Sequence, residues 1–256
     1  MEPLLTIVAS HRDRLDLNSN ITKWYLKSLF WQDDKRFEVV IADGGSKNYE
    51  ELKQYFESLN ESIKIRMVQH KIGDAFERAL LNNVGIRNSN TQYVMCSDVD
   101  MLYGKQFVST LISNLSKNSF VESRTMYLKQ KHCDLIYSGK LDPYNNLDEC
   151  KIGRLKKRTT AGGCECTSME NWNKLTGFSE RFVGWGSEDY ELLLRVGLLG
   201  LNLIWMGDSI KDIMLFHQAH SKNDTKKDLQ YQEENKKLLY NVKSYRANLN
   251  GWGGKL

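Results

Sequence analysis

Two adjacent acidic residues behind a glycine-rich turn are the strongest chemical signal in the sequence. Glu188 and Asp189 follow Gly184-Trp185-Gly186-Ser187 and open an apolar run with helical spacing. Such a turn lets the backbone approach a ligand closely, Trp185 offers a flat face for stacking, and Asp189 has a side chain that can accept a proton. Acids at this position are also typical of an ordinary helix start, because they complement the helix dipole. The turn alone therefore leaves both interpretations open.

A second acidic pair, Asp98-Val99-Asp100, follows the apolar run at residues 92–96, which is a predicted strand. Two carboxylates one residue apart in extended backbone point the same way. Such a pair can hold Mg²⁺ or Mn²⁺, with phosphate oxygens filling the remaining coordination positions. The same spacing also arises by chance in acidic loops, and the position directly after a strand favours the functional interpretation.

Histidines follow another predicted strand, at residues 213–216. His217 lies directly after it and His220 three residues further on, and a neutral imidazole beside carboxylates is a suitable ligand for Mn²⁺. Isolated histidines are more often structural. Met214, on the strand itself, is expected in the core, because a thioether is a soft partner for a hard ion.

Polar residues also follow the first two predicted strands. Arg12 and Arg14 leave the first strand on a loop, where guanidinium groups can pair with a diphosphate. A solvated loop with surface ion pairs is the alternative. Asp43 ends the second strand before two glycines and is placed to accept a hydrogen bond from a base or ribose, although turns use Asp-Gly in any case.

Strands and helices alternate along the first half of the chain. Apolar patterning predicts strands at residues 4–9, 37–42, 63–68 and 92–96, with helices at about 17–29, 49–59 and 74–86 between them. This order predicts an α/β fold with a mainly parallel central sheet flanked by helices. Ligands of such sheets bind beyond the carboxyl ends of the strands, where Arg12, Asp43 and Asp98 fall. Residues 120–158 have a weak pattern and are expected to form a variable excursion.

The second half of the chain has fewer clear elements. We expect strands at 159–167, 202–205 and 213–216, helices around 169–175 and 226–242, and a loose tail at Gly251-Trp252-Gly253-Gly254. The chain has 256 residues, which fits one domain with two halves. Its 41% hydrophobic content argues against wholesale disorder.

Charge and cysteine content indicate which partners and which cellular location to expect. The net charge of +4 is mild, and we expect no nucleic-acid partner. Basic clusters at 154–158 and 222–227 are compatible with contact at an anionic membrane surface, although such runs are more often solvated loops. Five cysteines without scaffold or zinc spacing favour a reducing compartment. We find no signal peptide and no apolar run long enough to span a bilayer. The expected location is the cytoplasm, including the inner face of a membrane.

Together the motifs resemble those of nucleotide-sugar glycosyltransferases with the GT-A fold. The resemblance is greatest to the group that contains the β1,4-galactosyltransferases and the bacterial chondroitin-polymerase type domains, and it extends to family 2 glycosyltransferases. It covers residues 4–220 and is weakest at 120–158. The motifs that carry it are Ser10-His11-Arg12-Asp13-Arg14, Asp98-Val99-Asp100, Ala161-Gly162-Gly163, Thr176-Gly177-Phe178, Gly184 to Asp189 and Met214-Leu215-Phe216-His217.

The resemblance implies a role for each matching residue. Asp189 matches the catalytic base, and its neighbours Trp185, Gly186 and Glu188 match positions that bind the donor sugar or the acceptor. The implied donor and nucleotide site consists of Arg12, Arg14, Asp43, Asn83, Asp98, Gly162 and Gly163. The implied metal ligands are Asp98, Asp100, His217 and Met214.

The implied activity is metal-dependent transfer of a hexose or N-acetylhexosamine from a UDP-sugar to an acceptor hydroxyl on a glycan or another molecule, with Mn²⁺ or Mg²⁺ as cofactor. Asp189 favours inversion, because the retaining polypeptide N-acetylgalactosaminyltransferases have asparagine at that position. Ser187 and Tyr190 depart from the galactosyltransferase pattern, so acceptor preference does not carry over. The alternatives are a retaining transferase, a nucleotidyltransferase, and a module that binds glycans or nucleotides without catalysis.

The implied organisation is a single domain. Its first half, at about 1–103, binds the nucleotide-sugar. Residues 104–225 bind the acceptor and carry the base, and residues 226–256 form a C-terminal helix and tail.

Overall fold

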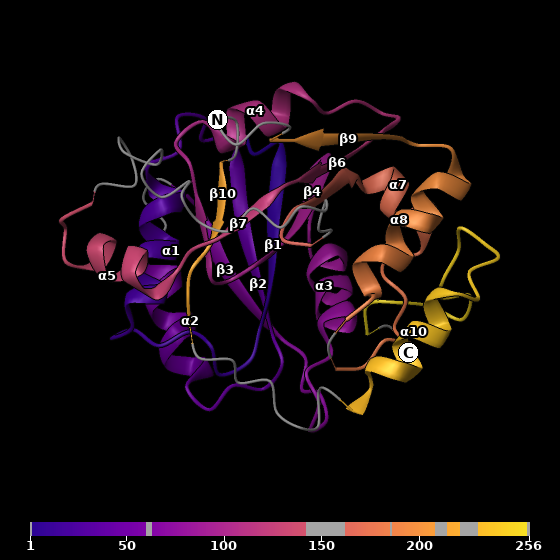
Figure 1. The fold of residues 1–256 in the computed structure, drawn as a ribbon, viewed down its shortest axis with the longest axis horizontal. Coiled ribbons are helices and arrows are strands. Elements are labelled where there is room, and N and C mark those ends of the chain that lie inside the picture. Colours follow the sequence, from indigo (N-terminus) through magenta and orange to yellow (C-terminus); the bar gives the residue numbers. More distant parts are fainter. Residues whose placement is uncertain are drawn as a thin grey trace.

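The computed structural model describes residues 2–59, 63–141, 162–184, 186–207, 214–220 and 230–254. In this part of the chain a central seven-stranded sheet has the order β3-β2-β1-β4-β8-β6-β9 (Figure 1). A smaller sheet has the order β5-β10-β7. The strands of the central sheet are β1 (Leu5–His11), β2 (Phe37–Asp43), β3 (Ile65–Gln69), β4 (Tyr93–Asp98), β6 (Ser119–Ser123), β8 (Glu165–Ser168) and β9 (Asn202–Met206). Those of the smaller sheet are β5 (Met101–Tyr103), β7 (Thr125–Tyr127) and β10 (Leu215–His217).

Helices cover both faces of the central sheet. The described helices are α1 (Asn20–Phe30), α2 (Tyr49–Ser58), α3 (Arg78–Arg87), α4 (Phe107–Ser113), α5 (Gln130–Tyr137), α7 (Met169–Leu175), α8 (Glu188–Leu199) and α10 (Gln232–Leu239). Of these, α5 packs against the smaller sheet. Serine side chains fix two helix starts, because Ser19 accepts a hydrogen bond from the N–H of Thr22 and Ser168 from that of Asn171. Figure 1 shows α3, α7 and α8 on one side of the sheet and α1 and α2 on the other.

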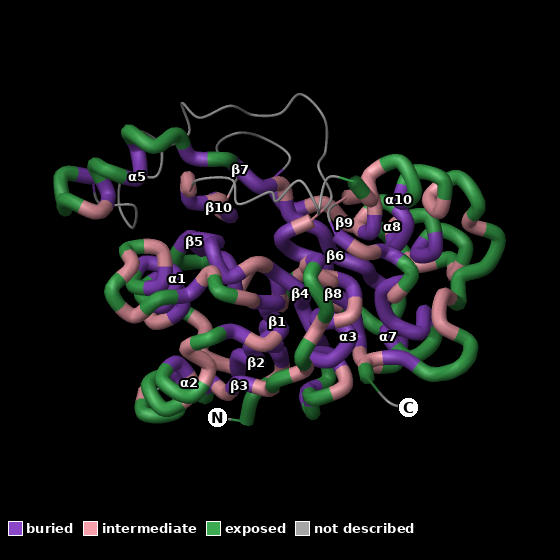
Figure 2. The backbone as a smooth tube through the Cα atoms, turned by 90° about the horizontal axis from the view of Figure 1, so that it is seen from below, coloured by how far each residue is buried: buried purple, intermediate pink, exposed green. Residues whose placement is uncertain are grey.

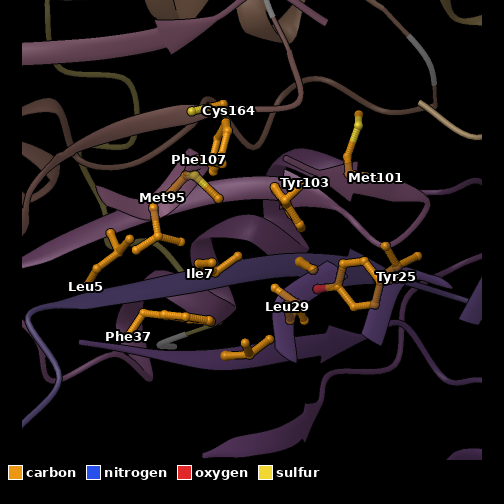
Figure 3. Packing of buried hydrophobic residues seen from close by; sticks show 14 of the residues in the cluster. Leu5, Ile7, Tyr25, Leu29, Phe37, Met95, Met101, Tyr103, Phe107 and Cys164 are labelled. Carbon is orange, nitrogen blue, oxygen red and sulfur yellow. The ribbon is translucent and has the colours of Figure 1, made fainter. Parts of the chain in front are cut away.

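Two hydrophobic clusters lie on opposite faces of the sheet, because successive strand residues alternate between faces. Ile7 of β1 packs with α1, α2 and α4 in the first cluster, and Val8 packs with α3, α7 and α8 in the second. Figure 3 shows the first cluster, where Ile7 lies among Leu5, Leu29 and Phe37. Figure 2 shows that the central strands are buried while the outer surfaces of the helices are exposed.

The predicted alternation of strands and helices is confirmed. Strands β1, β2, β3 and β4 are parallel, whereas β8 runs antiparallel to both β4 and β6. The register aligns His11 with Asp43 and Ser10 with Asp98. The carboxyl ends of β1, β2 and β4 therefore meet at one edge of the sheet, as expected from the sequence.

The interpretation of residues 120–158 as a variable excursion is wrong for its first part. β6 is an inner strand of the central sheet and is buried along its whole length. β7 follows it in the smaller sheet, and α5 lies beyond. Residues 142–158 lie outside the described part of the chain. β6 joins the sheet between β8 and β9, so it belongs to the scaffold that positions the site.

The expectation of a loose C-terminal tail is also wrong. Trp252 is buried in the cluster that contains α7 and α8, and its ring lies 5.2 Å from the guanidinium carbon of Arg87. The N–H of Gly253 donates a 2.6 Å hydrogen bond to Glu180. An indole of this size stabilises the fold through its large apolar area, so this segment is a fixed part of the domain.

Three element boundaries also differ from expectation. The third helix begins at Arg78 and not near residue 74, and β8 begins at Glu165, with residues 159–161 outside the described part of the chain. The C-terminal helix α10 covers Gln232–Leu239, and residues 226–229 of its expected range also lie outside the described part. Among the described residues, no helix combines the length and the apolar character needed to cross a membrane.

Candidate active site

The loops after β1 and β2 are tied together beneath the carboxyl edge of the sheet. His11 and Asp43 are fully buried, and the Nε2 atom of His11 lies 3.1 Å from the hydroxyl of Ser46 and 3.6 Å from the Asp43 carboxylate. Burial lowers the pKa of His11 to about 4, despite the opposing effect of Asp43. The Oδ1 atom of Asp43 accepts hydrogen bonds from two backbone N–H groups and from Gln69. The carboxylate of Asp43 thus fixes the turn, and its contact with a nucleoside stays a prediction.

Arg12 and Arg14 point to different parts of the edge. Arg12 donates hydrogen bonds to the backbone carbonyls of Gly73 and Asp74, at 2.5 and 2.8 Å. Arg14 lies 2.8 Å from the Nδ1 atom of His220 and 3.8 Å from Asp100. The structure therefore places only Arg14 next to the acidic and histidine residues described below.

Asp100, His217 and His220 form a cluster whose ligand atoms all lie within 4.8 Å of one another. The carboxylate of Asp100 lies 3.4 Å from the Nε2 atom of His217 and 3.0 Å from that of His220. Burial acts to raise the pKa of Asp100, but the two histidines and Arg14 outweigh it and lower this pKa. The ring of Tyr127 stacks on His217 with centroids 4.8 Å apart.

This cluster fits a divalent cation. The Oδ1 atom of Asp100 is buried, accepts no hydrogen bond from the described residues, and faces the imidazole of His217. One carboxylate with two imidazoles is a ligand set that suits Mn²⁺. We refer to Asp100, His217 and His220 as the metal cluster.

The structure does not bring Asp98 or Met214 into the metal cluster. Val99 and Asp100 form a turn, so the expected extended backbone is wrong, and the two carboxylates meet different partners. Asp98 pairs with Arg78. The sulfur of Met214 lies 3.9 Å from the hydroxyl of Thr110, and its side chain packs against the first hydrophobic cluster. Metal binding by these two residues stays a prediction.

Arg78, the first residue of α3, contacts four carboxyl groups. Its Nη1 atom lies 2.5 Å from Oδ1 of Asp189 and 3.5 Å from Glu188. Its Nε atom lies 3.0 Å from Asp98, and its Nη2 atom lies 3.4 Å from Glu165. A guanidinium group presents five donors in a fixed plane, which suits this arrangement. Arg78 therefore connects the end of β4 to the start of α8.

The carboxyl groups around Arg78 differ in their burial. The side chains of Asp98 and Asp189 are 31% and 19% exposed, whereas Glu165 is 0% exposed. Burial raises the pKa of Glu188 to about 7, and Asp189 adds to this effect. Burial also raises the pKa of Glu165 well above its ordinary value.

Gly162 leaves space for the carboxylate of Asp189. A Cβ atom at this position would lie 2.7 Å from Oδ2 of Asp189, and the backbone φ of +103° disfavours other residues. At Gly163 a Cβ atom would lie 2.9 Å from the methyl carbon of Met101. Of the two glycines predicted to line the donor site, Gly162 therefore lies beside Asp189, the predicted base.

Asn83 occupies a different environment from the one implied by the resemblance. Its amide nitrogen donates to the carbonyl of Phe178 and to Glu180, and its Oδ1 atom accepts from the N–H of Phe178. It joins α3 to the turn after α7, and its role in donor binding stays a prediction. Gly186 has φ +105°, with open space around it among the described residues. Trp185 lies outside the described residues.

Sequence reasoning missed Arg78, Glu165, Glu122 and Tyr127. Glu165 and Glu122 carried one usable signal, because each is a charged residue within an apolar strand, in Cys164-Glu165-Cys166 and Phe120-Val121-Glu122. An ionisable residue that a sheet buries needs a partner or a proton. Nothing in the local sequence marks Arg78.

The fold is that of the GT-A glycosyltransferases. The chain belongs to glycosyl transferase family 2, whose family model matches residues 21–167. A second model, described as the N-terminal domain of galactosyltransferase, matches residues 143–220. The two matches together include Asp98, Asp100, His217, Glu188 and Asp189.

Curated relatives agree with this assignment. The chain is 25% identical over 216 residues to a chondroitin synthase from Escherichia coli, covering 71% of this chain and 30% of that protein. It is 23% identical over 210 residues to β-1,4-galactosyltransferase 7 from Mus musculus, covering 77% of this chain and 56% of the relative. The chain thus spans less than two thirds of the length of either relative.

Two solved structures share the fold. The mannosyltransferase PcManGT from Pyrobaculum calidifontis, in complex with GDP-Man and Mn²⁺, aligns with TM-score 0.63 and 13% identity over 95% of this chain and 66% of that one. TarS 1–349 from S. aureus, in complex with UDP-GlcNAc, aligns with TM-score 0.59 and 16% identity over 88% of this chain and 60% of that one. Both of those proteins are therefore seen with a nucleotide-sugar, and the mannosyltransferase also with Mn²⁺.

Proposed function

We propose that the protein transfers a hexose or N-acetylhexosamine from a UDP-sugar to an acceptor hydroxyl, with inversion and with help from a divalent metal. The observation that carries this proposal is the contact of Arg78 with both Asp98 and Asp189. It joins the predicted base to Asp98 at the end of β4, and Asp100 in the turn that follows belongs to the metal cluster. The two chemical parts of the site are thus linked by a few residues at one edge of the sheet.

The metal cluster would hold Mn²⁺ or Mg²⁺ through Asp100, His217 and His220. When bound, such an ion neutralises the charge of the departing nucleoside diphosphate. Arg14 lies beside the cluster, and its guanidinium group is suited to pairing with phosphate oxygens. The chemistry of this donor set and the Mn²⁺ in one structure of the same fold support the assignment.

Asp189 is the proposed base. Its Oδ1 atom accepts a hydrogen bond from Arg78, which leaves Oδ2, next to Gly162, to receive the acceptor proton. Its side chain is 19% exposed, so an acceptor hydroxyl has access to it. A carboxylate held by a fixed cation keeps its orientation as the proton moves, which is the requirement for general base catalysis.

Similar proteins support the proposed donor and the proposed kind of product. UDP-GlcNAc binding by TarS supports a UDP-sugar donor, and the chondroitin synthase relative supports a role in glycan or polysaccharide synthesis. In this proposal residues 1–103 bind the donor, and residues 104–225 bind the acceptor and supply the base. The described cysteines are free and buried, which supports a reducing compartment and therefore the cytoplasm.

Turnover with a panel of UDP-sugars tests the proposal. Purified protein is incubated with each donor and a set of glycan acceptors in Mn²⁺, and released UDP and the glycosylated product are measured. We expect one preferred donor, loss of transfer in EDTA, and recovery when Mn²⁺ is restored. Unchanged rates in EDTA would contradict the metal assignment, and absence of transfer with every UDP-sugar would contradict the donor class.

Product stereochemistry tests inversion separately. With an α-linked donor, the proton coupling constants of the product should show a β linkage. An α-linked product would identify a retaining transferase on the same fold and remove the need for Asp189 as a base.

A further inference from the structure

Among the described residues, the carboxyl groups near Arg78 outnumber the positively charged groups that contact them. Four of them contact its guanidinium group directly. A fifth, Glu122 of β6, lies directly opposite Glu165 of β8 in the antiparallel pair. Side chains at such positions are direct neighbours on one face of the sheet. If all five were ionised, one guanidinium group would face five carboxylates.

Burial shows which of these groups must be neutral. Glu122 and Glu165 are both 0% exposed, whereas Asp98 and Asp189 reach solvent. An ionised carboxylate without its own counterion is far more costly in a buried position than a protonated one. Glu188 is 6% exposed, so excess protons in the cluster belong first on the two fully buried glutamates of the sheet.

The hydrogen bonds point to the same assignment. The Oε2 atom of Glu165 is buried and receives no hydrogen bond from the described residues, and Asp189 is near enough for a hydrogen bond between the two carboxyl groups. Two carboxylates have no hydrogen to share, so such a bond requires a proton on one member of the pair. Asp189 is the more exposed member and has the shorter contact with Arg78, at 2.5 Å against 3.4 Å, so the proton is expected on Glu165. The neighbouring strand contributes no charge, because the residue paired with Glu165 on β4 is the buried thiol of Cys96.

We propose that Glu165 is protonated in the resting protein and donates a hydrogen bond to Asp189, so that it acts with Arg78 as a positioning residue for the base. Glu122 stays neutral behind it. Asp189 is then held by one cation and one neutral donor, which fixes its carboxylate without a full buried negative charge beside it. The part of this proposal that concerns catalysis rests on the proposed function, whereas the protonation of Glu165 stands independently of it.

A second buried glutamate, Glu191, serves as a matched control because it is ionised. Glu191 on α8 is also buried, but it pairs one to one with Arg195 at 2.8 Å, and the two side chains are 2% and 1% exposed. Replacing an ionised glutamate by glutamine removes a charge that its arginine needs. Replacing a protonated one leaves the charge balance unchanged and retains a donor group.

The experiment compares Glu165→Gln, Glu165→Ala and Glu191→Gln with the wild type. We expect Glu165→Gln to keep the wild-type melting temperature at neutral pH, whereas Glu191→Gln melts at a lower temperature. The infrared spectrum of the wild type at neutral pH should contain a protonated carboxyl band that weakens in Glu165→Gln. A band of unchanged intensity, or a melting temperature lowered as much as in the control, would overturn the proposed protonation.

Activity tests the positioning role. Glu165→Ala should lower kcat roughly 10- to 100-fold with little change in the KM for the donor, because a misplaced base slows the chemical step. Glu165→Gln should restore most of that loss. Equal losses of kcat in both variants would overturn the role as a neutral donor. The melting and infrared measurements need no substrate, so they remain decisive even if the protein proves not to use UDP-sugars.

Discussion

The contact between Gly162 and Asp189 allows a prediction whose size follows from the structure. In Gly162→Ala the new Cβ atom would lie 2.7 Å from Oδ2 of Asp189, and ordinary contacts begin at 3.4 Å. The carboxylate must therefore move by about 0.7 Å, although the hydrogen bond from Arg78 to its Oδ1 atom opposes this movement. A misplacement of about 1 Å at a reacting group can cost roughly 100-fold in rate. We expect kcat to fall roughly 10- to 100-fold.

The same substitution also strains the backbone. Gly162 has φ +103°, which a residue with a Cβ atom adopts at a cost of about 1–3 kcal/mol. Gly200→Ala is the matched control, because Gly200 is the C-cap of α8, the helix that carries Asp189 in its first turn. Gly200 has φ +77°, and a Cβ atom there would meet no described atom within 4 Å. It should lose stability by a similar amount and keep its activity.

The assay measures initial rates of transfer together with urea unfolding for both variants. Loss of stability in both and loss of kcat in Gly162→Ala alone is the expected result. Wild-type kcat in Gly162→Ala, with a loss of stability equal to that of Gly200→Ala, would refute the reasoning that the position of Asp189 against this glycine matters.

Three further predictions concern the metal cluster, the C-terminal segment and pH. His220→Gln should raise the Mn²⁺ concentration needed for half-maximal activity by more than about tenfold, whereas His132→Gln on α5 should leave it unchanged; equal responses would remove His220 from the metal cluster. Trp252→Ala should lower the free energy of unfolding by about 3–5 kcal/mol, measured in urea, because it empties a buried indole site; a negligible change would contradict its place in the core. His11 has a folded pKa of about 4 against 6.5 unfolded, so its contribution to stability is present above pH 6.5 and is lost as the pH falls towards 4, by about 3 kcal/mol. The difference in unfolding free energy between wild type and His11→Gln should shrink across that range, and a constant difference would contradict the buried neutral imidazole.

The strands of the first half were predictable because each is a continuous apolar run followed by polar residues. β1, β2 and β4 are buried along almost all of their length on both faces, as parallel strands covered by helices are. β6 has the same burial but includes Ser119, Glu122 and Ser123. Its polar residues conceal an inner strand, because their partners lie on other elements. A sequence pattern shows that a residue is polar, but it does not show which groups on other elements will pair with that residue.

Site residues that lie together in one sequence motif were predictable. Site residues that only the tertiary fold brings together were not. Asp189 and its glycine-rich turn form one continuous motif, whereas Arg78 gains its importance only when α3 packs beside β4, β8 and α8. The pair Asp98 and Asp100 was recognised, but a turn at residues 99–100 sends the two carboxylates to different partners. Spacing in the sequence cannot distinguish that turn from an extended strand end.

The central claim is that Asp189 is the base of a UDP-sugar transferase. The direct test measures transfer by Asp189→Asn with the preferred donor and, on the same preparation, the affinity for UDP in Mn²⁺ by calorimetry. The variant is nearly isosteric, and a melting curve verifies that it is folded. We predict loss of transfer by at least about 100-fold, with UDP affinity close to that of the wild type. Transfer at the wild-type rate would contradict the assignment of Asp189 as the base.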